Sequence, residues 1–212
     1  MPVKKLKITL YLILVCSTFT TRLLASSNEI KWQLVTDDNG IQVYTLETPG
    51  TNIVKAKATT VLRFPIIKLK ETLDDIEHRH EWIPFLMVSK PLTDYVNNQR
   101  IEYSHFYGPW PASDRDFVYE IKLLTQTKDR LVYKMQSVTT QLMPVTNDKV
   151  RANLIESIYT LTALDATSTQ VELIFHADPR GWVPNWIINI IQRALPYKIM
   201  KNLTTRLETG QN

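Results

Sequence analysis

The sequence predicts an α+β fold in which a curved antiparallel sheet carries one long C-terminal helix across its concave face, with a cavity between the two. Three observations support this prediction. Apolar and polar residues alternate over most of the stretch from position 41 to 177, which indicates strands. The connections between these runs are short, which favours antiparallel pairing. Beyond Gly181 the apolar residues recur at helical spacing instead.

The strands and one early helix follow in order along the chain. A turn at 37–40 precedes a strand over 41–47, and a turn at 49–50 precedes a strand over 53–61. Apolar residues in 64–77 lie near a helical period and predict a helix that ends before Pro84. The other strands occupy 85–93, 99–107, 115–125, 131–138, 152–164 and 170–177. With them the expected meander has about eight strands.

The predicted C-terminal helix has a wide apolar stripe. Pro184 suits its first turn, because the fixed φ of proline matches a helix and no N–H is needed there. Pro196 is expected to kink or break the helix before it resumes toward Leu207. The stripe consists of Trp182, Val183, Trp186, Ile187, Ile190 and Ile191. We expect Trp186 and Ile190 to project onto the sheet.

The first 25 residues have the three parts of a secretory signal peptide. Lysines at positions 4, 5 and 7 precede an apolar run over 8–19, and small residues follow at 25–27. The run is shorter than the ~20 residues that a membrane-spanning helix needs. We therefore expect residues 1–25 to be a signal peptide and 26–212 to be one exported domain, periplasmic or secreted. An uncleaved N-terminal membrane anchor is the alternative.

Composition limits the partners of this domain. The chain has 25 Lys and Arg against 21 Asp and Glu, but Lys4, Lys5, Lys7 and Arg22 lie in the predicted signal peptide, which leaves 21 of each sign. A neutral domain lacks the basic surface that nucleic-acid binding requires. The one cysteine, Cys16, also lies in the predicted signal peptide, so the domain has no disulfide. We expect a monomer that binds no nucleic acid.

The sequence contains no motif for a metal, a cofactor or a nucleophile. His78 and His80 are two residues apart, so on a helix they would point to nearly opposite sides, and no cysteine or third nearby histidine completes a set. A glycine-rich phosphate loop and the Gly-x-Ser-x-Gly motif are both missing from the sequence. We therefore expect neither a metal nor a cofactor.

Four blocks of sequence carry a resemblance to a known family. The blocks are His80-Glu-Trp-Ile-Pro84, Pro109-Trp-Pro-Ala-Ser-Asp-Arg-Asp-Phe-Val118, the strand that Val150-Arg151 opens and that continues through Glu156 and Tyr159, and Asp178-Pro-Arg-Gly-Trp-Val-Pro-Asn-Trp-Ile-Ile-Asn189. In this order and spacing they resemble the START family of lipid-binding domains over about residues 29–208. The second and fourth blocks are most similar to the phosphatidylcholine-transfer branch.

The resemblance implies a helix-grip fold whose cavity holds one hydrophobic or amphipathic lipid: a phospholipid, a sterol-like molecule or a fatty acid. It also implies lipid transfer or sensing, transient membrane contact and no catalysis. Sterol-binding relatives place a cavity arginine six positions after the Arg of Arg-Asp-Phe, where this chain has an isoleucine. The residues that we expect at the ligand cavity are Glu102, Arg115, Phe117, Tyr119, Ile121, Arg151, Glu156, Trp186 and Ile190.

Two other functions stay open at this point. An enzyme that acts on an apolar substrate in such a cavity would need a titratable group with a strongly shifted pKa, for which Glu102, Glu156 and His105 are the candidates. An interaction module of a cell-envelope assembly would instead fill the cavity with its own side chains and expose a large apolar patch.

Overall fold

The computed structural model describes residues 31–51 and 53–210, so the predicted signal peptide lies outside the described residues. The described residues form one ten-stranded sheet and a C-terminal helical segment, which confirms the predicted α+β helix-grip fold. The elements are β1 (Gln33–Asp38), β2 (Ile41–Leu46), β3 (Lys55–Leu62), α1 (Ile66–Asp74), η1 (Arg79–Glu81), β4 (Leu86–Pro91), β5 (Gln99–Phe106), β6 (Arg115–Gln126), β7 (Arg130–Ser137), β8 (Val150–Arg151), β9 (Asn153–Ala163), β10 (Thr169–Asp178), α2 (Asn185–Asn189), η2 (Ile190–Ala194) and α3 (Leu195–Thr209).

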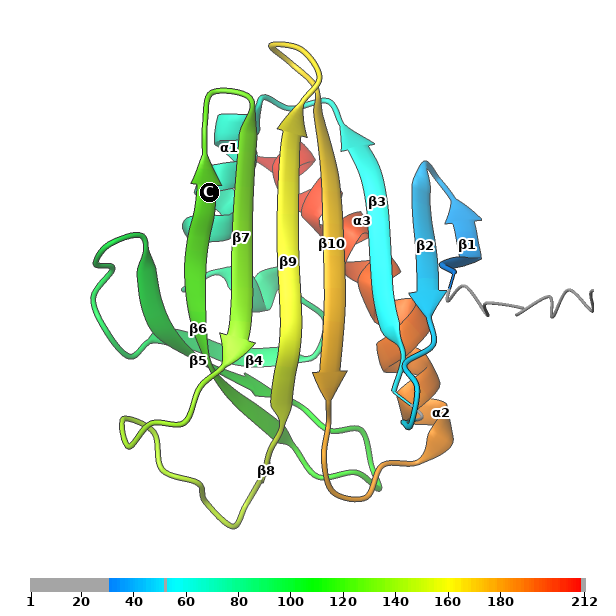
Figure 1. Ribbon diagram of the computed structural model, residues 1–212, viewed down its shortest axis with the longest axis vertical. Coiled ribbons are helices and arrows are strands. Elements are labelled where there is room, and N and C mark those ends of the chain that lie inside the picture. The colour runs from blue at the N-terminus through cyan, green and yellow to red at the C-terminus, as the bar shows by residue number, and fades with distance from the viewer. Residues whose placement is uncertain (1–30, 52, 211–212) are drawn as a thin grey trace, which may run out of the picture.

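The sheet differs from the simple meander of eight strands that the sequence predicts. Its order is β1-β2-β3-β10-β9-β7-β6-β5-β4, so the last strand pairs with the third. These neighbours pair antiparallel, as predicted, but the two-residue β8 pairs parallel to β6. Figure 1 shows this sheet in front of α1 and α3, so the helices cover one of its faces.

The C-terminal helical segment consists of three parts. The five-residue α2 continues into the π-helical η2, and α3 follows with Pro196 in its first turn. The break that the sequence predicts is thus a π-helical stretch just before this proline. The first turn of α3 accepts the proline, because its missing N–H is not needed there. The segment ends at Gly210, whose φ of 61° places it in the left-handed region that favours glycine after a helix.

The main core lies between α3, α1 and the sheet. Leu69 of α1 and Met200 and Leu203 of α3 are fully buried there. Ala56 and Ala58 of β3 are also buried, and their small side chains leave room for α3 close to the sheet. Fully burying one leucine side chain stabilises a fold by about 1.5–3 kcal/mol. This core therefore fixes α3 on the sheet.

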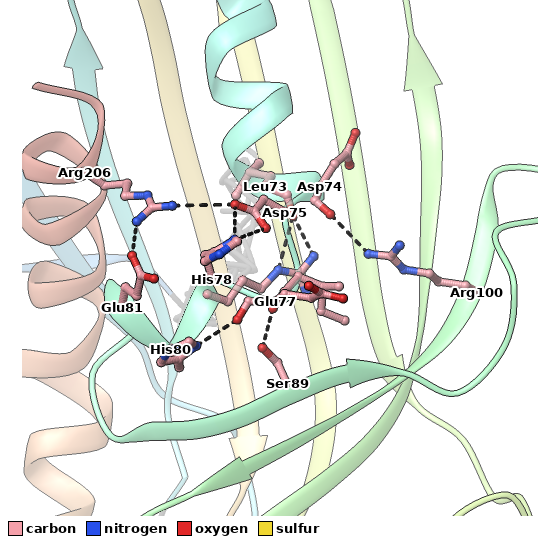
Figure 2. A network of polar contacts seen from close by, with 12 residues as sticks. Leu73, Asp74, Asp75, Glu77, His78, His80, Glu81, Ser89, Arg100 and Arg206 are labelled. Atoms are coloured by element: carbon pink, nitrogen blue, oxygen red, sulfur yellow. Dashed lines mark hydrogen bonds and ion pairs between the residues drawn. The ribbon is translucent and has the colours of Figure 1, made fainter. Parts of the chain in front are cut away.

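Polar contacts attach α3 as well (Figure 2). The buried Arg206 forms ion pairs with Glu81 of η1 and, at 3.6 Å, with Asp75, which ends α1. Asn202 donates a 2.9 Å hydrogen bond to the backbone carbonyl of Trp82. Tyr197 donates a 2.5 Å hydrogen bond to Asp38 at the end of β1. Thus α3 is held at several points along its length.

Candidate ligand cavity

A cavity of about 170 Å³ lies between the helical segment and the sheet. Its walls come from the end of α1, from η1 and the segment that follows it, from β5, β6, β9 and β10, and from α2, η2 and α3. Pockets that bind small molecules usually span about 300–1,000 Å³. The volume of this cavity is therefore below that range, and it is small for a large ligand.

Most of the cavity wall is apolar. Phe106 and Phe117 meet edge to face on the sheet side, with ring centroids 5.6 Å apart. Ile187, Ile190 and Ile191 cover the opposite side from the helical segment. Among the described residues that line the cavity, arginines are the only charged ones and no Asp, Glu, Lys or His contributes. Such a wall suits a hydrocarbon ligand.

The buried Arg79 connects this wall to the end of α1. Its Nε and Nη2 donate hydrogen bonds to the backbone carbonyl of Leu73, at 3.2 and 2.6 Å. This carbonyl belongs to the last turn of α1, where a helix leaves carbonyls without intrahelical partners and favours a positive charge. Arg79 therefore caps α1 and reaches the cavity with the same side chain.

Arg79 also forms a buried ion pair with Glu102. The Nη1 of Arg79 lies 2.6 Å from one carboxylate oxygen, and Nε of Arg100 lies 2.7 Å from the other. Burial alone would raise the pKa of the fully buried Glu102, but the two guanidinium groups lower it below its usual value. Burial opposes the charge of Arg79, yet Glu102 raises the pKa of this arginine. Both groups are therefore charged.

Four hydroxyl groups line the same cavity as Arg79. Ser104 and Tyr119 share a 3.0 Å hydrogen bond. Tyr159 and Ser157 also line the cavity. Burial raises the pKa of Tyr119 and of Tyr159. Both phenols therefore stay protonated at neutral pH.

The opposite end of the cavity is formed by two loops, which lie side by side at the lower end of Figure 1. The first joins β5 to β6 and is closed by Asp114, which accepts a 2.8 Å hydrogen bond from the Gly108 N–H and lies 2.7 Å from Nε2 of His105. A side chain at position 108 would place its Cβ 2.0 Å from the carbonyl oxygen of Ser113. Glycine is therefore required where this loop narrows.

Arg115 joins the second loop, which connects β10 to α2, to the first. Its guanidinium donates to the backbone carbonyls of Pro179, Arg180 and Trp182, and also to that of Ser113. Gly181 has a φ of 60° in this turn, and a Cβ there would lie 4.0 Å from the Arg115 guanidinium. Through these hydrogen bonds the charged Arg115 side chain holds both loops at the mouth of the cavity.

Exposed aromatic side chains surround the mouth. Trp110 at the tip of the first loop is 85% exposed, and Trp182 in the second loop is 68% exposed. Trp186 of α2 is 48% exposed, and Phe85 and Tyr107 on the rim are exposed as well. Exposed large apolar groups around one opening indicate contact with another apolar surface.

Four of the nine residues predicted at the cavity lie in its wall, namely Arg115, Phe117, Tyr119 and Ile190. The alternation along β6 places Phe117 and Tyr119 on the inner face, and Ile190 reaches the wall from η2. Their contact with a ligand stays a prediction.

The other five lie elsewhere. Glu102 is buried against Arg79 and Arg100, and Ile121 is part of the closed core. Arg151 forms an ion pair with Asp116, with 2.8 Å between Nε and the carboxylate, and Glu156 pairs with Lys55 at 2.9 Å. The half-exposed Trp186 is outside the wall, so its expected projection onto the sheet is not what the structure shows.

The cavity wall also contains Arg79, Ser104, Ser157 and Tyr159, which were not predicted from the sequence. The alternation of side chains along β9 could have identified two of these residues. Ser157 and Tyr159 lie on the same face of the strand as the buried Leu161, whereas Glu156 lies on the opposite face. Arg79 offered no such signal, because its contacts depend on how η1 docks against β5.

No described helix has the length and apolar character needed to cross a bilayer. No group of three or more His, Cys, Asp or Glu side chains close enough to bind a metal occurs in residues 31–51 and 53–210.

Several known proteins are similar to this chain in sequence or in fold. Phosphatidylcholine transfer protein of Rattus norvegicus is 24% identical over 162 residues, which are 74% of this chain and 75% of that protein. The crystal structure of human STARD10 matches with a TM-score of 0.76 and 23% identity, over 83% of this chain and 72% of that one.

A bacterial structure, the STAR-related lipid transfer protein of Xanthomonas axonopodis, matches with a TM-score of 0.73 and 24% identity, over 84% of this chain and 98% of that fragment. The family model described as START domain matches residues 19–212, which is most of the sequence. The chain therefore belongs to the START domain family.

Proposed function

We propose that this START domain binds one lipid molecule in its cavity and exchanges it with membranes without catalysing a reaction. The observation that carries the proposal is the mostly apolar wall between the helical segment and the sheet, whose only charged residues in the described part of the chain are Arg79 and Arg115. Burying about 300 Å² of hydrocarbon there would contribute on the order of 7 kcal/mol, so affinity needs no reactive group.

The ionisation of the buried groups supports a role without catalysis. A general acid or base works best when its pKa lies near the working pH. The pKa of Glu102 is lowered, and those of Tyr119 and Tyr159 are raised, so each is moved away from neutrality. His105 pairs with Asp114 in the loop, and Glu156 pairs with Lys55. None of the three candidates for an enzyme is thus placed for proton transfer in the cavity.

The tryptophans at the mouth support exchange at a membrane. Trp side chains favour the interface between water and lipid, because the ring is apolar and its N–H is polar. Trp110, Trp182 and Trp186 come from the two loops and from α2, which together frame the opening. A lipid could then pass between bilayer and cavity without crossing water.

Native mass spectrometry of the full chain, recovered after expression with its own N-terminal segment, tests the binding. We expect one lipid per protein, identified after organic extraction. A protein that carries no lipid and takes up no fluorescent lipid from vesicles would contradict the proposal. N-terminal sequencing of the same sample tests our further proposal of export, for which we expect the recovered chain to begin near Ser26.

Transfer between donor and acceptor vesicles tests the membrane step. The double variant with Trp110→Ala and Trp182→Ala should lower the transfer rate about tenfold, because it removes two interfacial anchors, and should leave the melting temperature unchanged. Leu124→Ala is the matched control, since Leu124 is also exposed but lies nine residues along β6 from Arg115, roughly 30 Å from the mouth. Equal transfer by both variants would argue against docking through the mouth.

A further inference from the structure

The turn between η1 and β4 contains a backbone conformation that its sequence disfavours. Residues 83–86 form a tight turn, closed by a 3.3 Å hydrogen bond from the Leu86 N–H to the Ile83 carbonyl. Pro84 occupies the second position, and Phe85 occupies the third with a φ of 65°. This is the pattern of a type II turn, whose third position normally belongs to glycine or asparagine. Phe85 is therefore strained, because its Cβ crowds the backbone in this conformation.

The other residues of positive φ in the described chain are of a different kind. Apart from glycines they are Asn39, Asn97, Asn98 and Arg180. Asparagine tolerates this region because its short polar side chain can hydrogen-bond locally. Arg180 lies in an exposed loop, next to Gly181. A phenyl ring has no such local compensation, and strained residues of this kind concentrate where a protein handles a ligand.

The backbone on both sides of Phe85 is held by other elements. Asn202 of α3 donates its hydrogen bond to the carbonyl of Trp82, just before the turn. The carbonyl of Phe85 itself accepts a 2.8 Å hydrogen bond from the N–H of Tyr107 in the loop between β5 and β6. Leu86 then begins β4, which pairs with β5. The turn is thus held on three sides, and its surroundings impose the strained conformation.

The strained backbone places the ring of Phe85 where the cavity opens. Phe85 lines the cavity and is also 38% exposed, whereas Trp82 lines it from a position with 3% exposure. Phe85 is therefore at the rim. With its backbone held, the side chain is the part of this residue that can move, and partly exposed side chains change rotamer within nanoseconds.

From these observations we propose that Phe85 controls the rate of lipid exchange. Its ring closes part of the mouth and has to rotate outward for each lipid that enters or leaves. Such a residue has a distinct kinetic signature, because an obstacle on the path slows entry and release by the same factor and leaves the affinity unchanged. A residue that only contacts the bound lipid slows release alone. This inference rests on the proposed lipid binding and names the residue that sets its rate.

Stopped-flow fluorescence of the full chain measures both rates. The probe is whichever of three fluorescent lipids, a fatty acid, a phosphatidylcholine and a sterol, the parent protein binds most tightly. Association is followed after mixing with labelled vesicles, and dissociation after mixing the loaded protein with an excess of unlabelled vesicles. Phe85→Asn removes the ring but accepts the left-handed backbone. It should raise both rates about tenfold and change the dissociation constant by less than about threefold.

Two further variants separate the ring from the backbone. Phe85→Tyr keeps an aromatic ring and should exchange lipid at the rate of the parent. Asn98→Gly changes the backbone at another position of positive φ, in the connection between β4 and β5, and is the matched control that should alter neither rate.

Melting temperatures test the strain itself. Phe85→Gly and Phe85→Ala both lose the ring, but only glycine adopts a φ of 65° without strain, so the glycine variant should melt about 3 °C above the alanine variant. Equal melting temperatures would contradict the strain and overturn the inference. Faster release of the probe by Phe85→Asn with unchanged association, or no change in either rate, would overturn it too but leave lipid binding intact. Failure of the parent to bind any of the three probes would overturn the proposed function as well.

Discussion

The two halves of the C-terminal helical segment are held in different ways. The last half, α3, has Met200 and Leu203 fully buried and reaches other elements through Arg206, Asn202 and Tyr197. The first half, α2 and η2, contributes isoleucines to the cavity wall and leaves Trp186 half exposed. The loop before α2 is bound by Arg115, but α2 and η2 themselves border the empty space of the cavity. The side of the segment that covers the cavity is thus the side with the weaker attachment.

The largest expected effect of this difference is on stability. Leu203→Ala should cost about 2–5 kcal/mol, because it leaves a cavity in a closed core. Ile190→Ala should cost less than half as much, because Ile190 already borders empty space. Urea unfolding at equilibrium measures both losses. Similar losses for the two variants would mean that both halves are equally fixed.

The ion pairs of Arg206 provide the next test. Arg206→Gln should cost about 1–2 kcal/mol in the same assay, since it removes a buried cation whose partners Glu81 and Asp75 are only partly buried. Arg193→Gln, at an exposed position of η2, is the matched control and should stay within about 0.5 kcal/mol of the parent. A control that destabilises as much as Arg206→Gln would contradict the comparison.

Hydrogen exchange should show the same asymmetry without a mutation. Amides of α2 and η2 should exchange roughly tenfold or more faster than those in the middle of α3, because local opening needs less buried surface to be exposed. A saturating ligand should slow exchange in α2 and η2 and have little effect on α3. Uniform protection along all three elements would refute the idea of a movable first half.

The smallest effect concerns pH. A hydrogen bond to Asp75 raises the pKa of His78 above 6.5, so its stabilising contribution is complete below pH 6.5 and is lost as the pH rises through the raised value. Because Asp75 also pairs with Arg206, His78 belongs to the attachment of α3 (Figure 2). His78→Gln should reduce this loss of stability between about pH 6 and 8, measured by the urea midpoint.

His176 provides a contrast of opposite sign. Burial, with a smaller effect of Lys55, lowers the pKa of this residue below 6.5. The unfolded chain therefore binds the proton more readily, and stability should fall as the pH drops from 6.5 through the lowered value. His176→Gln should remove this loss on the acid side only. A change on the alkaline side would contradict the assignment.

The sequence predicted the local elements better than their long-range arrangement. The runs that became β5, β6, β7, β9 and β10 alternate clearly, because each has one buried face. In contrast, β1 is half exposed and polar, and β8 has only two residues, so neither produces a recognisable pattern.

The candidate cavity was predictable only where periodicity places a residue on the inner face. Phe117 and Tyr119 follow from the alternation of β6, and attention to parity in β9 would have replaced Glu156 by Tyr159. The pairing of Arg79 with Glu102, 23 residues apart, depends on the docking of η1 against the sheet. No local pattern contains that information.

The pairing of β3 with β10 has a consequence for how the chain folds. Thr60 lies opposite Val171, so the centre of the sheet joins segments that are more than a hundred residues apart in sequence. Sheets dominated by such contacts fold slowly, on the order of milliseconds to seconds, because a long loop must close first. During synthesis β1, β2 and β3 remain without their central neighbour until the last strand emerges. The nascent chain therefore presents an open strand edge for most of its synthesis, and a chaperone that covers β3 would protect it from aggregation.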